Sequence, residues 1–226
     1  MAVIKHSDQR VAIFIDTQNL YHSAKNLYNS KVNFGKVLSE ALAGRKLIRA
    51  LAYVITTEAG DETQFFEALT KIGIETKTKD LQIFFGGSKK ADWDVGMAVD
   101  AIRIAPKVDT IILATGDGDF APLVVFLKEH FGVQVEVISF GRSSSSKLKE
   151  VTEDFIDMCD HPEEFLIGHG RSTGTRRPAH NTQSKKRTKL SKAVTEQIAE
   201  NAHVEKHVER IEKKTESSPL LGEDVV

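Results

Sequence analysis

The 226-residue chain has a single cysteine, Cys159, so it cannot form an internal disulfide. It also has no uninterrupted apolar stretch of the roughly 20 residues that a membrane-spanning helix needs. The first ten residues, MAVIKHSDQR, contain no apolar core of the kind found in secretory signals. These absences predict a cytoplasmic protein that does not contact a membrane.

Charge is almost balanced over the whole chain, with a formal net charge of -1, but it is unevenly distributed. Residues 171–192 contain eight Lys/Arg and no Asp/Glu. We therefore expect a folded domain over residues 1–167, a basic disordered linker over 168–189, and a short helix with a disordered terminus over 190–226. The tail is predicted to hold RNA phosphates, to bind a protein partner or a second copy of the chain, or to act only as a solvated spacer.

Strand and helix patterns alternate along the predicted domain. Strands are predicted at 11–16, 47–55, 74–80, 109–115 and 133–140. The signal is a short apolar run in each case except 74–80, where an alternating pattern indicates a partly exposed edge strand. Helical spacing predicts helices at 33–44, 65–72, 92–105, 119–131 and 143–158. In the third of these helices, Val95, Val99 and Ile102 share one side. The alternation predicts an α/β fold: a three-layer α/β/α sandwich around a parallel sheet with strand order 3-2-1-4-5.

Acidic residues follow two of the predicted strands. The first strand ends in Asp16, with Asn19 three residues later, and the fourth is followed by Thr115, Asp117 and Asp119. In the predicted strand order these two ends are neighbours at the point where the order reverses, which is where open α/β sheets bind ligands. We expect Gly116 and Gly118 to allow positive φ and close approach of the backbone.

A third group of acids lies at the start of the helix predicted over 92–105. Asp92 is expected to cap this helix and Asp94 to lie in its first turn. Asp100 is about 120° away from Asp94 around an ideal helix, so we expect it to support the site from behind or to lie on the surface. Clustered carboxylates without a cysteine and histidine set favour Mg²⁺ or Mn²⁺ over Zn²⁺.

Three segments together carry a family resemblance: FIDTQNL, KKADWDVGMAVDA and LATGDGDFAPLVVFLKEHFGVQVEVISFG. They resemble the NYN domain in its LabA-like (DUF88) branch, within the PIN-like nucleases. The resemblance covers about residues 10–160 and implies ribonuclease activity at an acidic Mg²⁺ or Mn²⁺ site. It implies that the catalytic, metal-binding residues are Asp16, Asp94, Asp117 and Asp119, with Asp100 as a later companion of Asp94. Thr115 replaces a serine that is common in the family.

The predicted function is hydrolysis of RNA, with single-stranded RNA as the expected partner. Asn19, Thr115, Lys90 and Arg103 are the candidate substrate-binding residues, and Trp93 either stacks on a base or packs in the core. A structural interpretation is also open, in which Asp16, Asp117 and Asp119 only cap helices and turns. Two other functions are open: a regulatory or binding module that keeps the acidic pocket without catalysis, and another Mg²⁺ enzyme such as a phosphatase or sugar-nucleotide transferase.

Overall fold

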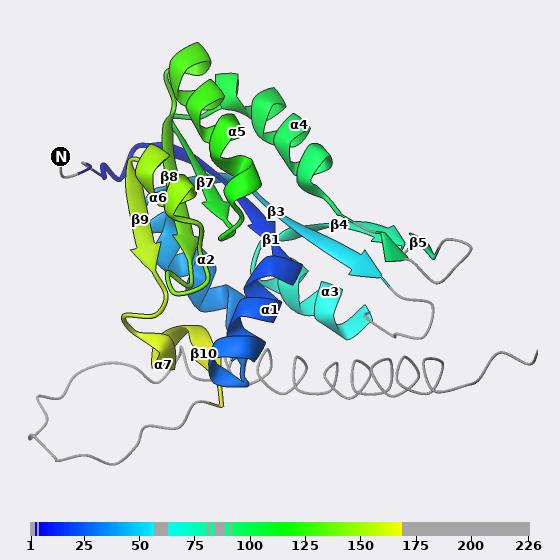
Figure 1. Cartoon of the computed structure of the whole chain (residues 1–226). Coiled ribbons are helices and arrows are strands. Elements are labelled where there is room, and N and C mark those ends of the chain that lie inside the picture. Colours follow the sequence, from blue (N-terminus) through cyan, green and yellow to red (C-terminus); the bar gives the residue numbers. More distant parts are fainter. Residues whose placement is uncertain are drawn as a thin grey trace, which may run out of the picture.

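The computed structural model describes residues 3, 5–56, 63–80, 82–83, 89–90 and 92–168. Its centre is a six-stranded sheet in which every neighbouring pair of strands is parallel (Figure 1). The strands in spatial order are β4 (Glu75–Asp80), β3 (Lys46–Thr56), β1 (Arg10–Asp16), β7 (Thr110–Ala114), β8 (Gln134–Ser139) and β9 (Asp154–Asp157). The first five are the predicted strands in the predicted order, so the α/β prediction is confirmed, and β9 extends the sheet.

Helices cover both faces of the sheet and complete the three layers (Figure 1). One face carries α1 (Thr17–Tyr28), α2 (Phe34–Leu42) and α3 (Thr63–Lys71). The other face carries α4 (Asp94–Ile104), α5 (Ala121–Phe126) and α6 (Ser146–Val151). After β4 the chain crosses back over the sheet to β7, on the other side of β1, and the helices from α4 onward cover the second face. In the sheet, the strand order therefore reverses between β1 and β7.

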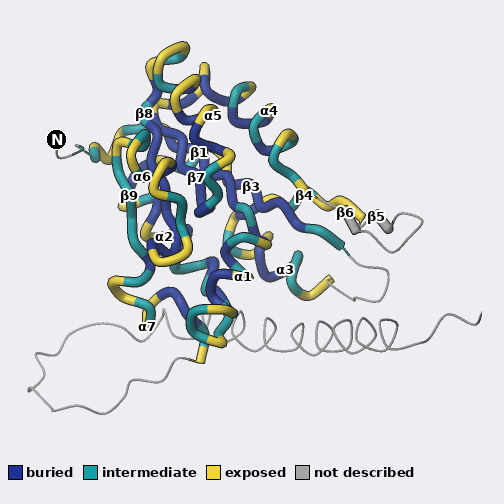
Figure 2. Tube along the Cα trace, viewed as in Figure 1, coloured by how far each residue is buried: buried dark blue, intermediate teal, exposed yellow. Residues whose placement is uncertain are grey.

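The central strand β1 shows why the apolar runs in this sequence are continuous. Val11, Ile13 and Ile15 belong to the core under α1 and α2, whereas Ala12 and Phe14 belong to the core under α4 and α5. All five residues have no exposed surface, and the strands form the dark blue centre of Figure 2. A strand covered on both faces gains from apolar side chains at every position, so it loses the usual alternation.

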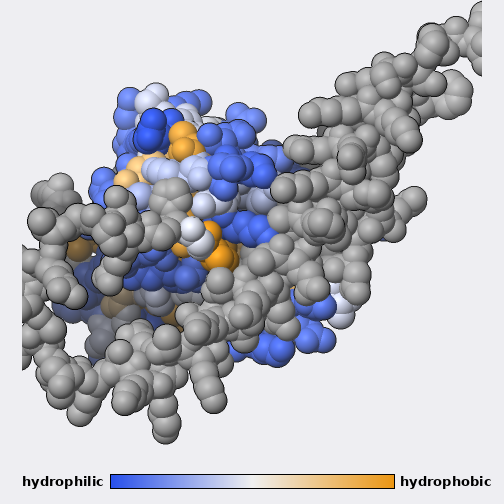
Figure 3. Space-filling model, turned by 90° about the horizontal axis from the view of Figure 1, so that it is seen from below, coloured by the Kyte–Doolittle hydropathy of each residue, from blue (hydrophilic) through white to orange (hydrophobic). Residues whose placement is uncertain are grey.

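Smaller elements complete the described part of the chain. They are β2 (Lys31–Val32) paired with β10 (Leu166–Ile167), β5 (Gln82–Ile83) paired with β6 (Lys89–Lys90), the 3-10 helices η1 (Ala105–Lys107) and η2 (Gly118–Phe120), the π-helical turn η3 (Leu127–Phe131), and α7 (Pro162–Phe165). The predicted linker and tail lie outside the described residues, apart from Gly168. No helix in the described residues has the length and apolarity to cross a bilayer. The described surface visible in Figure 3 is mostly hydrophilic, with small apolar patches.

The helix predicted over residues 143–158 is wrong in its second half. The chain leaves α6 at Thr152, whose backbone is extended, and then forms β9. Phe155 packs against the core on one face of the sheet and Ile156 against the core on the other. Only a strand points consecutive side chains to opposite faces, so burial of this pair outweighs the local helical pattern.

The predicted apolar side of α4 is wrong for Val95 and Val99, whereas Ile102 packs against the core as expected. Val95 is 74% exposed and Val99 is 47% exposed, whereas Met97, Ala101 and Ile104 are buried. The helix therefore packs through a neighbouring stripe of residues. Asp94 is the first residue of this helix, so the face through which α4 packs on the sheet determines where the Asp94 side chain lies.

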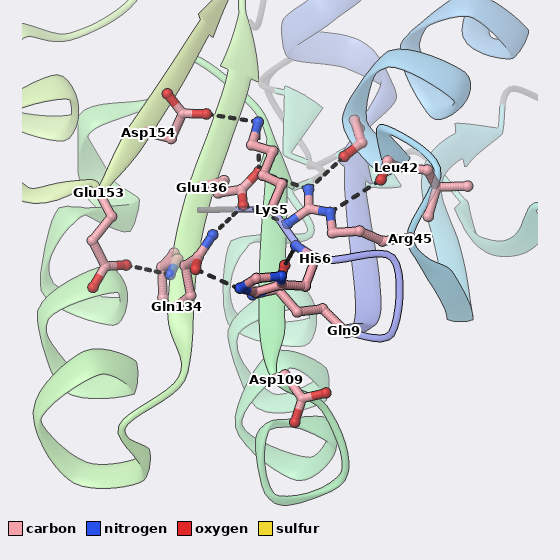
Figure 4. Close-up of polar contacts among 12 residues, drawn as sticks. Lys5, His6, Gln9, Leu42, Arg45, Asp109, Gln134, Glu136, Glu153 and Asp154 are labelled. Atoms are coloured by element: carbon pink, nitrogen blue, oxygen red, sulfur yellow. Dashed lines mark hydrogen bonds and ion pairs between the residues drawn. The ribbon is translucent and has the colours of Figure 1, made fainter. Parts of the chain in front are cut away.

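A buried ion pair fixes the opposite edge of the sheet, where the strands begin (Figure 4). The guanidinium of Arg45 donates to both carboxylate oxygens of Glu136 at 2.6 and 2.9 Å, and both side chains are fully buried. The same guanidinium donates to the carbonyls of Ala41 and Leu42 at the end of α2. Lys5 adds an ion pair to Glu136 at 3.3 Å. The network ties α2, β8 and the N-terminal segment together, so its role is structural.

Candidate acidic metal centre

The candidate site lies where the strand order reverses. From β1 the chain crosses to β3 on one side, while β7 pairs with β1 on the other, and Ile15 of β1 is level with Ala114 of β7. Asp16 and Thr115 therefore stand next to each other at the carboxyl edge of the sheet. This is the position that the sequence predicts for a ligand crevice.

Three of the four predicted metal-binding carboxylates come together here. Asp94, Asp117 and Asp119 each offer an oxygen, and these oxygens all lie within 4.8 Å of one another. Asp94 is the first residue of α4, Asp117 precedes η2 and Asp119 lies within it. The cluster thus joins residues from two successive crossover connections, one before β7 and one after it.

The electrostatics of the cluster are unfavourable without a cation. Burial and the charges of Asp117, Asp16, Asp92 and Asp119 raise the pKa of Asp94 to about 6. All of these contributions act in the same direction, and none comes from a cation of the protein. A divalent cation would remove the repulsion, and a set of carboxylate oxygens suits Mg²⁺ or Mn²⁺. The residues therefore fit such an ion.

Asp16 lies beside this cluster and is not one of its three members. Its carboxylate accepts hydrogen bonds from the backbone N–H of Asn19 at 3.0 Å and from the Thr115 hydroxyl at 3.2 Å. Burial raises its pKa, although both hydrogen bonds oppose that rise. Asp16 is thus the cap of α1, as one interpretation predicted, while its charge still acts on Asp94 and Asp117. Its role as a metal ligand stays a prediction.

Two predicted substrate-binding residues hold the acidic loop in place. The Asn19 side-chain oxygen accepts a hydrogen bond from the Gly116 amide at 2.8 Å. The buried Thr115 hydroxyl donates to Asp16 and accepts from the Asp117 amide at 3.2 Å. These bonds connect the end of β1 to the loop after β7. Contact of either residue with a substrate stays a prediction.

Asp117 combines the structural and the chemical interpretation. One carboxylate oxygen accepts a hydrogen bond from the Asp119 amide at 2.9 Å, which caps η2. The same side chain belongs to the three-carboxylate cluster. Capping fixes one oxygen and so holds the side chain still, which leaves the second oxygen in a defined position. The two interpretations are therefore compatible.

The glycines of this loop are needed for space. Neither Gly116 nor Gly118 has a positive φ, so that part of the expectation is wrong. A β-carbon at Gly116 would lie 2.8 Å from the Ser144 hydroxyl and 3.1 Å from the Ser144 α-carbon. At Gly118 it would lie 2.6 Å from the Ser145 hydroxyl. The expected close approach of the backbone is confirmed.

Asp100 points to a different set of partners. It is buried and accepts a hydrogen bond from the Tyr53 hydroxyl at 2.8 Å and another from the Lys77 ammonium. Burial alone would raise its pKa, but these hydrogen bonds outweigh burial and lower it. Arg103 lies 4.0 Å away, with a largely exposed guanidinium. Sequence reasoning missed Tyr53 and Lys77, which are level with each other in the register of β3 and β4.

The remaining predicted residues near α4 have simpler roles. Trp93 donates from its indole to the Val54 carbonyl at 3.0 Å and packs edge-on against Tyr53, so it anchors the start of α4. Trp93 also occupies the capping position expected for Asp92, which is exposed. Lys90 lies in β6, and its side chain is outside the part of the chain that the structure describes.

An α/β sandwich with clustered carboxylates at its strand-reversal point belongs to the class of open α/β domains that can hold a divalent cation at this edge. Comparison with known proteins identifies the family: residues 10–159 match the NYN domain, and the chain belongs to this family, a member of the PIN-like nuclease superfamily. The family and its LabA-like branch are those expected from the sequence motifs.

The proteins that resemble the chain include two curated relatives and a solved structure. The low amplitude and bright protein LabA of Synechococcus elongatus is 26% identical over 160 residues, which are 67% of this chain and 84% of LabA. The uncharacterized protein MJ0482 of Methanocaldococcus jannaschii is 29% identical over 72% of this chain, which spans 60% of that protein. A solved protein of unknown function, VPA0982 from Vibrio parahaemolyticus, is 32% identical with a TM-score of 0.65, covering 73% of this chain and all of that one.

Proposed function

We propose that this protein is a metal-dependent ribonuclease that hydrolyses phosphodiester bonds in single-stranded RNA. The observation that supports the proposal best is the cluster of Asp94, Asp117 and Asp119, whose oxygens lie within 4.8 Å of one another at the carboxyl edge of the sheet. Membership of the NYN family favours nuclease chemistry at such a cluster.

In this proposal Asp94, Asp117 and Asp119 hold Mg²⁺ or Mn²⁺, with Asp16 as the fourth acid. The ion would supply activation of a water molecule and stabilisation of negative charge on the phosphate. The chain itself supplies position: Asn19 and Thr115 fix the loop that carries two of the carboxylates. Arg103, whose guanidinium is largely exposed beside Asp100, and Lys90 are the proposed phosphate contacts.

The attacking group determines the ends of the products. Attack by water leaves a 5′-phosphate and a 3′-hydroxyl, whereas attack by the ribose 2′-hydroxyl leaves a cyclic phosphate. An acidic metal centre favours water, because the ion lowers the pKa of a water molecule and does not require the ribose hydroxyl. We therefore expect 5′-phosphate ends, and cyclic phosphate ends would contradict the proposed chemistry.

The test is cleavage of a 5′-labelled single-stranded RNA by the purified full chain with Mn²⁺, with Mg²⁺ or with EDTA. The Asp117→Asn variant keeps the size of the side chain and an oxygen that can cap η2, but it lowers the charge of the cluster. We expect cleavage with metal, none with EDTA, and a loss of at least about 100-fold in the variant, because charge stabilisation contributes several kcal/mol to such reactions. Activity with EDTA or in the variant would argue against the proposal.

Two further assays on the same protein, RNA binding and hydrolysis of a small phosphoester, would support the other functions. RNA binding without cleavage would favour a regulatory or binding module, with the basic tail as the next segment to study. Cleavage of a small phosphoester such as p-nitrophenyl phosphate, with RNA left intact, would favour another metal-dependent enzyme on this fold.

A further inference from the structure

The loop after β8 packs directly against the acidic loop. The Ser145 amide donates a hydrogen bond to the Gly116 carbonyl at 2.9 Å, and α6 packs against η2. The start of the loop is fixed as well, because the Gly141 amide donates to the Asp157 carboxylate at 2.8 Å. A second segment of the chain therefore forms a wall of the site, held in place at both of its ends.

The serines of this loop do different things. The Ser143 hydroxyl donates to the Ser23 hydroxyl at 2.8 Å, and the Ser144 hydroxyl donates to the Phe140 carbonyl at 2.8 Å. Both hydroxyls are therefore used to hold the loop. The Ser145 hydroxyl makes no hydrogen bond with any residue that the structure describes, although Ser145 occupies the capping position of α6. The Ser145 hydroxyl is therefore a polar group of this wall that is left free for a ligand, in addition to the fully buried Ser139 hydroxyl, which also has no partner in the described part of the chain.

The free hydroxyl lies next to the carboxylate cluster. Ser145 Oγ packs so closely on Gly118 that a β-carbon there would approach it to 2.6 Å. Gly118 stands between Asp117 and Asp119, two of the three clustered carboxylates. Ser145 is half-buried, so its hydroxyl is positioned by its surroundings while it can still be reached from solvent. Any phosphate bound at the carboxylates would lie close to this group.

A cation follows the serine in the sequence, at the start of α6. Lys147 lies in the first turn of α6, is exposed, and forms no ion pair with a carboxylate among the residues that the structure describes. A lysine in this state is strongly hydrated and can neutralise a phosphate without breaking an existing contact. A hydroxyl donor beside a carboxylate cluster, followed two residues later by a free ammonium, suits the phosphate backbone of a nucleic acid.

We propose that Ser145 and Lys147 bind the RNA phosphate next to the one that is cleaved. The Ser145 hydroxyl donates to a non-bridging oxygen of that phosphate, and Lys147 neutralises its charge. The two residues position the substrate and take no part in the bond changes. This inference rests on the proposed ribonuclease function, and it assigns RNA contact to the side of the site formed by β8 and α6.

The test measures RNA binding separately from cleavage. Anisotropy of a fluorescein-labelled single-stranded RNA is titrated with the full chain and EDTA, at several salt concentrations. Ser145→Ala and Lys147→Gln are compared with two control variants: Ser146→Ala, the next serine, and Lys107→Gln, an exposed lysine of η1 that precedes β7 and so lies at the opposite edge of the sheet. Mn²⁺ binding to the RNA-free variants, followed by calorimetry, tests whether the carboxylate cluster is intact.

We expect Ser145→Ala to weaken RNA binding about tenfold, because it removes a hydrogen bond to a charged group. Lys147→Gln should reduce the slope of log affinity against log salt by about 0.7, the value for one phosphate contact with a single strand. Mn²⁺ affinity should stay within twofold of the wild type in both variants, and both controls should behave as the wild type.

Several outcomes would overturn the inference. The first is that Ser145→Ala binds RNA as tightly as Ser146→Ala while Lys147→Gln keeps the salt slope of the wild type. The second is that the wild type binds no RNA. If the wild type cleaves RNA while the variants match their controls, the ribonuclease function stands and this inference fails. If the variants lose RNA affinity and the wild type cleaves nothing, the RNA contact stands and the ribonuclease proposal fails.

Discussion

Replacing Asp94 with asparagine should stabilise the metal-free protein, although it removes a proposed ligand. Asp94 has a pKa of about 6 in the folded chain and an ordinary value of 3.8. That difference corresponds to about 3 kcal/mol of unfavourable free energy at neutral pH. Because Asp94 is partly exposed, solvent screens the effect, and we expect the Asp94→Asn variant to be more stable by about 1 kcal/mol.

The sign of the pH dependence follows from proton binding. Between about pH 4 and pH 6 the folded chain keeps a proton on Asp94 that the unfolded chain has released. The penalty from Asp94 is therefore absent below about pH 4, grows through this window and is complete above about pH 6. The stability difference between Asp94→Asn and the wild type should be largest at pH 7.5 and should shrink toward zero near pH 4.

The assay is urea unfolding with EDTA at pH 4.5, 6 and 7.5, repeated at pH 7.5 with Mn²⁺. Mn²⁺ should stabilise the wild type and have little effect on Asp94→Asn, since a ligand that binds only the folded state adds to its stability. Asp109→Asn is the matched control, because hydrogen bonds from Arg10 lower the pKa of Asp109 to about 2. Its stabilising contribution is present above about pH 4, so its removal should destabilise the chain at pH 7.5.

Two results would refute this reasoning. The first is an Asp94→Asn variant that is no more stable than the wild type at pH 7.5 with EDTA. The second is a gain in stability that is the same at all three pH values, which would mean that the carboxylate charge is not its cause.

Three further variants test the supports of the site. Gly116→Ala should cost about 1 to 3 kcal/mol of stability in urea unfolding and weaken Mn²⁺ binding. The reason is that its β-carbon would meet the Ser144 hydroxyl at 2.8 Å and the Ser144 backbone at 3.1 Å. An unaffected variant would mean that the loop after β8 can move away. Asn19→Ala leaves the Gly116 amide without its acceptor. Calorimetry should therefore record weaker Mn²⁺ binding, and urea unfolding should record a loss of about 1 to 3 kcal/mol of stability. Unchanged values would mean that Asn19 does not support the loop and has a role only in substrate contact. Glu136→Gln leaves the buried Arg45 without a counter-charge and should cost about 3 to 5 kcal/mol of stability. The Mn²⁺ affinity of the folded chain should stay the same, because the ion pair lies at the opposite edge of the sheet. A change in that affinity would contradict a purely structural role for this ion pair.

The central strands could be predicted because burial on both faces leaves a continuous apolar run in the sequence of such a strand. The run VAIFID is apolar at successive positions, and such runs occur where both faces are covered. Asp16 and Asp117 could be placed near each other for the same reason, since the ends of neighbouring parallel strands meet at one edge of the sheet. The topology therefore predicts that Asp16 and Asp117 lie at the same edge of the sheet.

The missed features depend on packing that the sequence pattern does not contain. Phe155 and Ile156 lie on opposite faces because β8 offers an open edge, which the helical spacing of residues 143–158 cannot reveal. Val95 and Val99 are apolar but exposed, because the orientation of α4 follows Met97 and Ala101. Apolar character alone does not identify the buried side of a helix when two stripes of residues compete.

The position of Lys77 shows a further limit. The alternating pattern of residues 74–80 identifies a strand at the edge of the sheet, but it does not say which acidic side chain a lysine on that strand will meet. Asp100 meets Lys77 and Tyr53 and so turns away from Asp94, an arrangement that follows from the register of β3 against β4. Register and helix orientation are properties of the assembled sheet.

The distance along the chain between Asp16 and the clustered acids has a consequence for synthesis. Asp16 leaves the ribosome about a hundred residues before Asp117, and the loop that carries Ser145 follows later still. The carboxylates meet only after β7 has inserted beside β1, so an unfinished chain has its first acid but no assembled centre. A nascent chain still attached to its own messenger RNA would then carry no cluster able to bind a divalent cation until most of the domain had been translated.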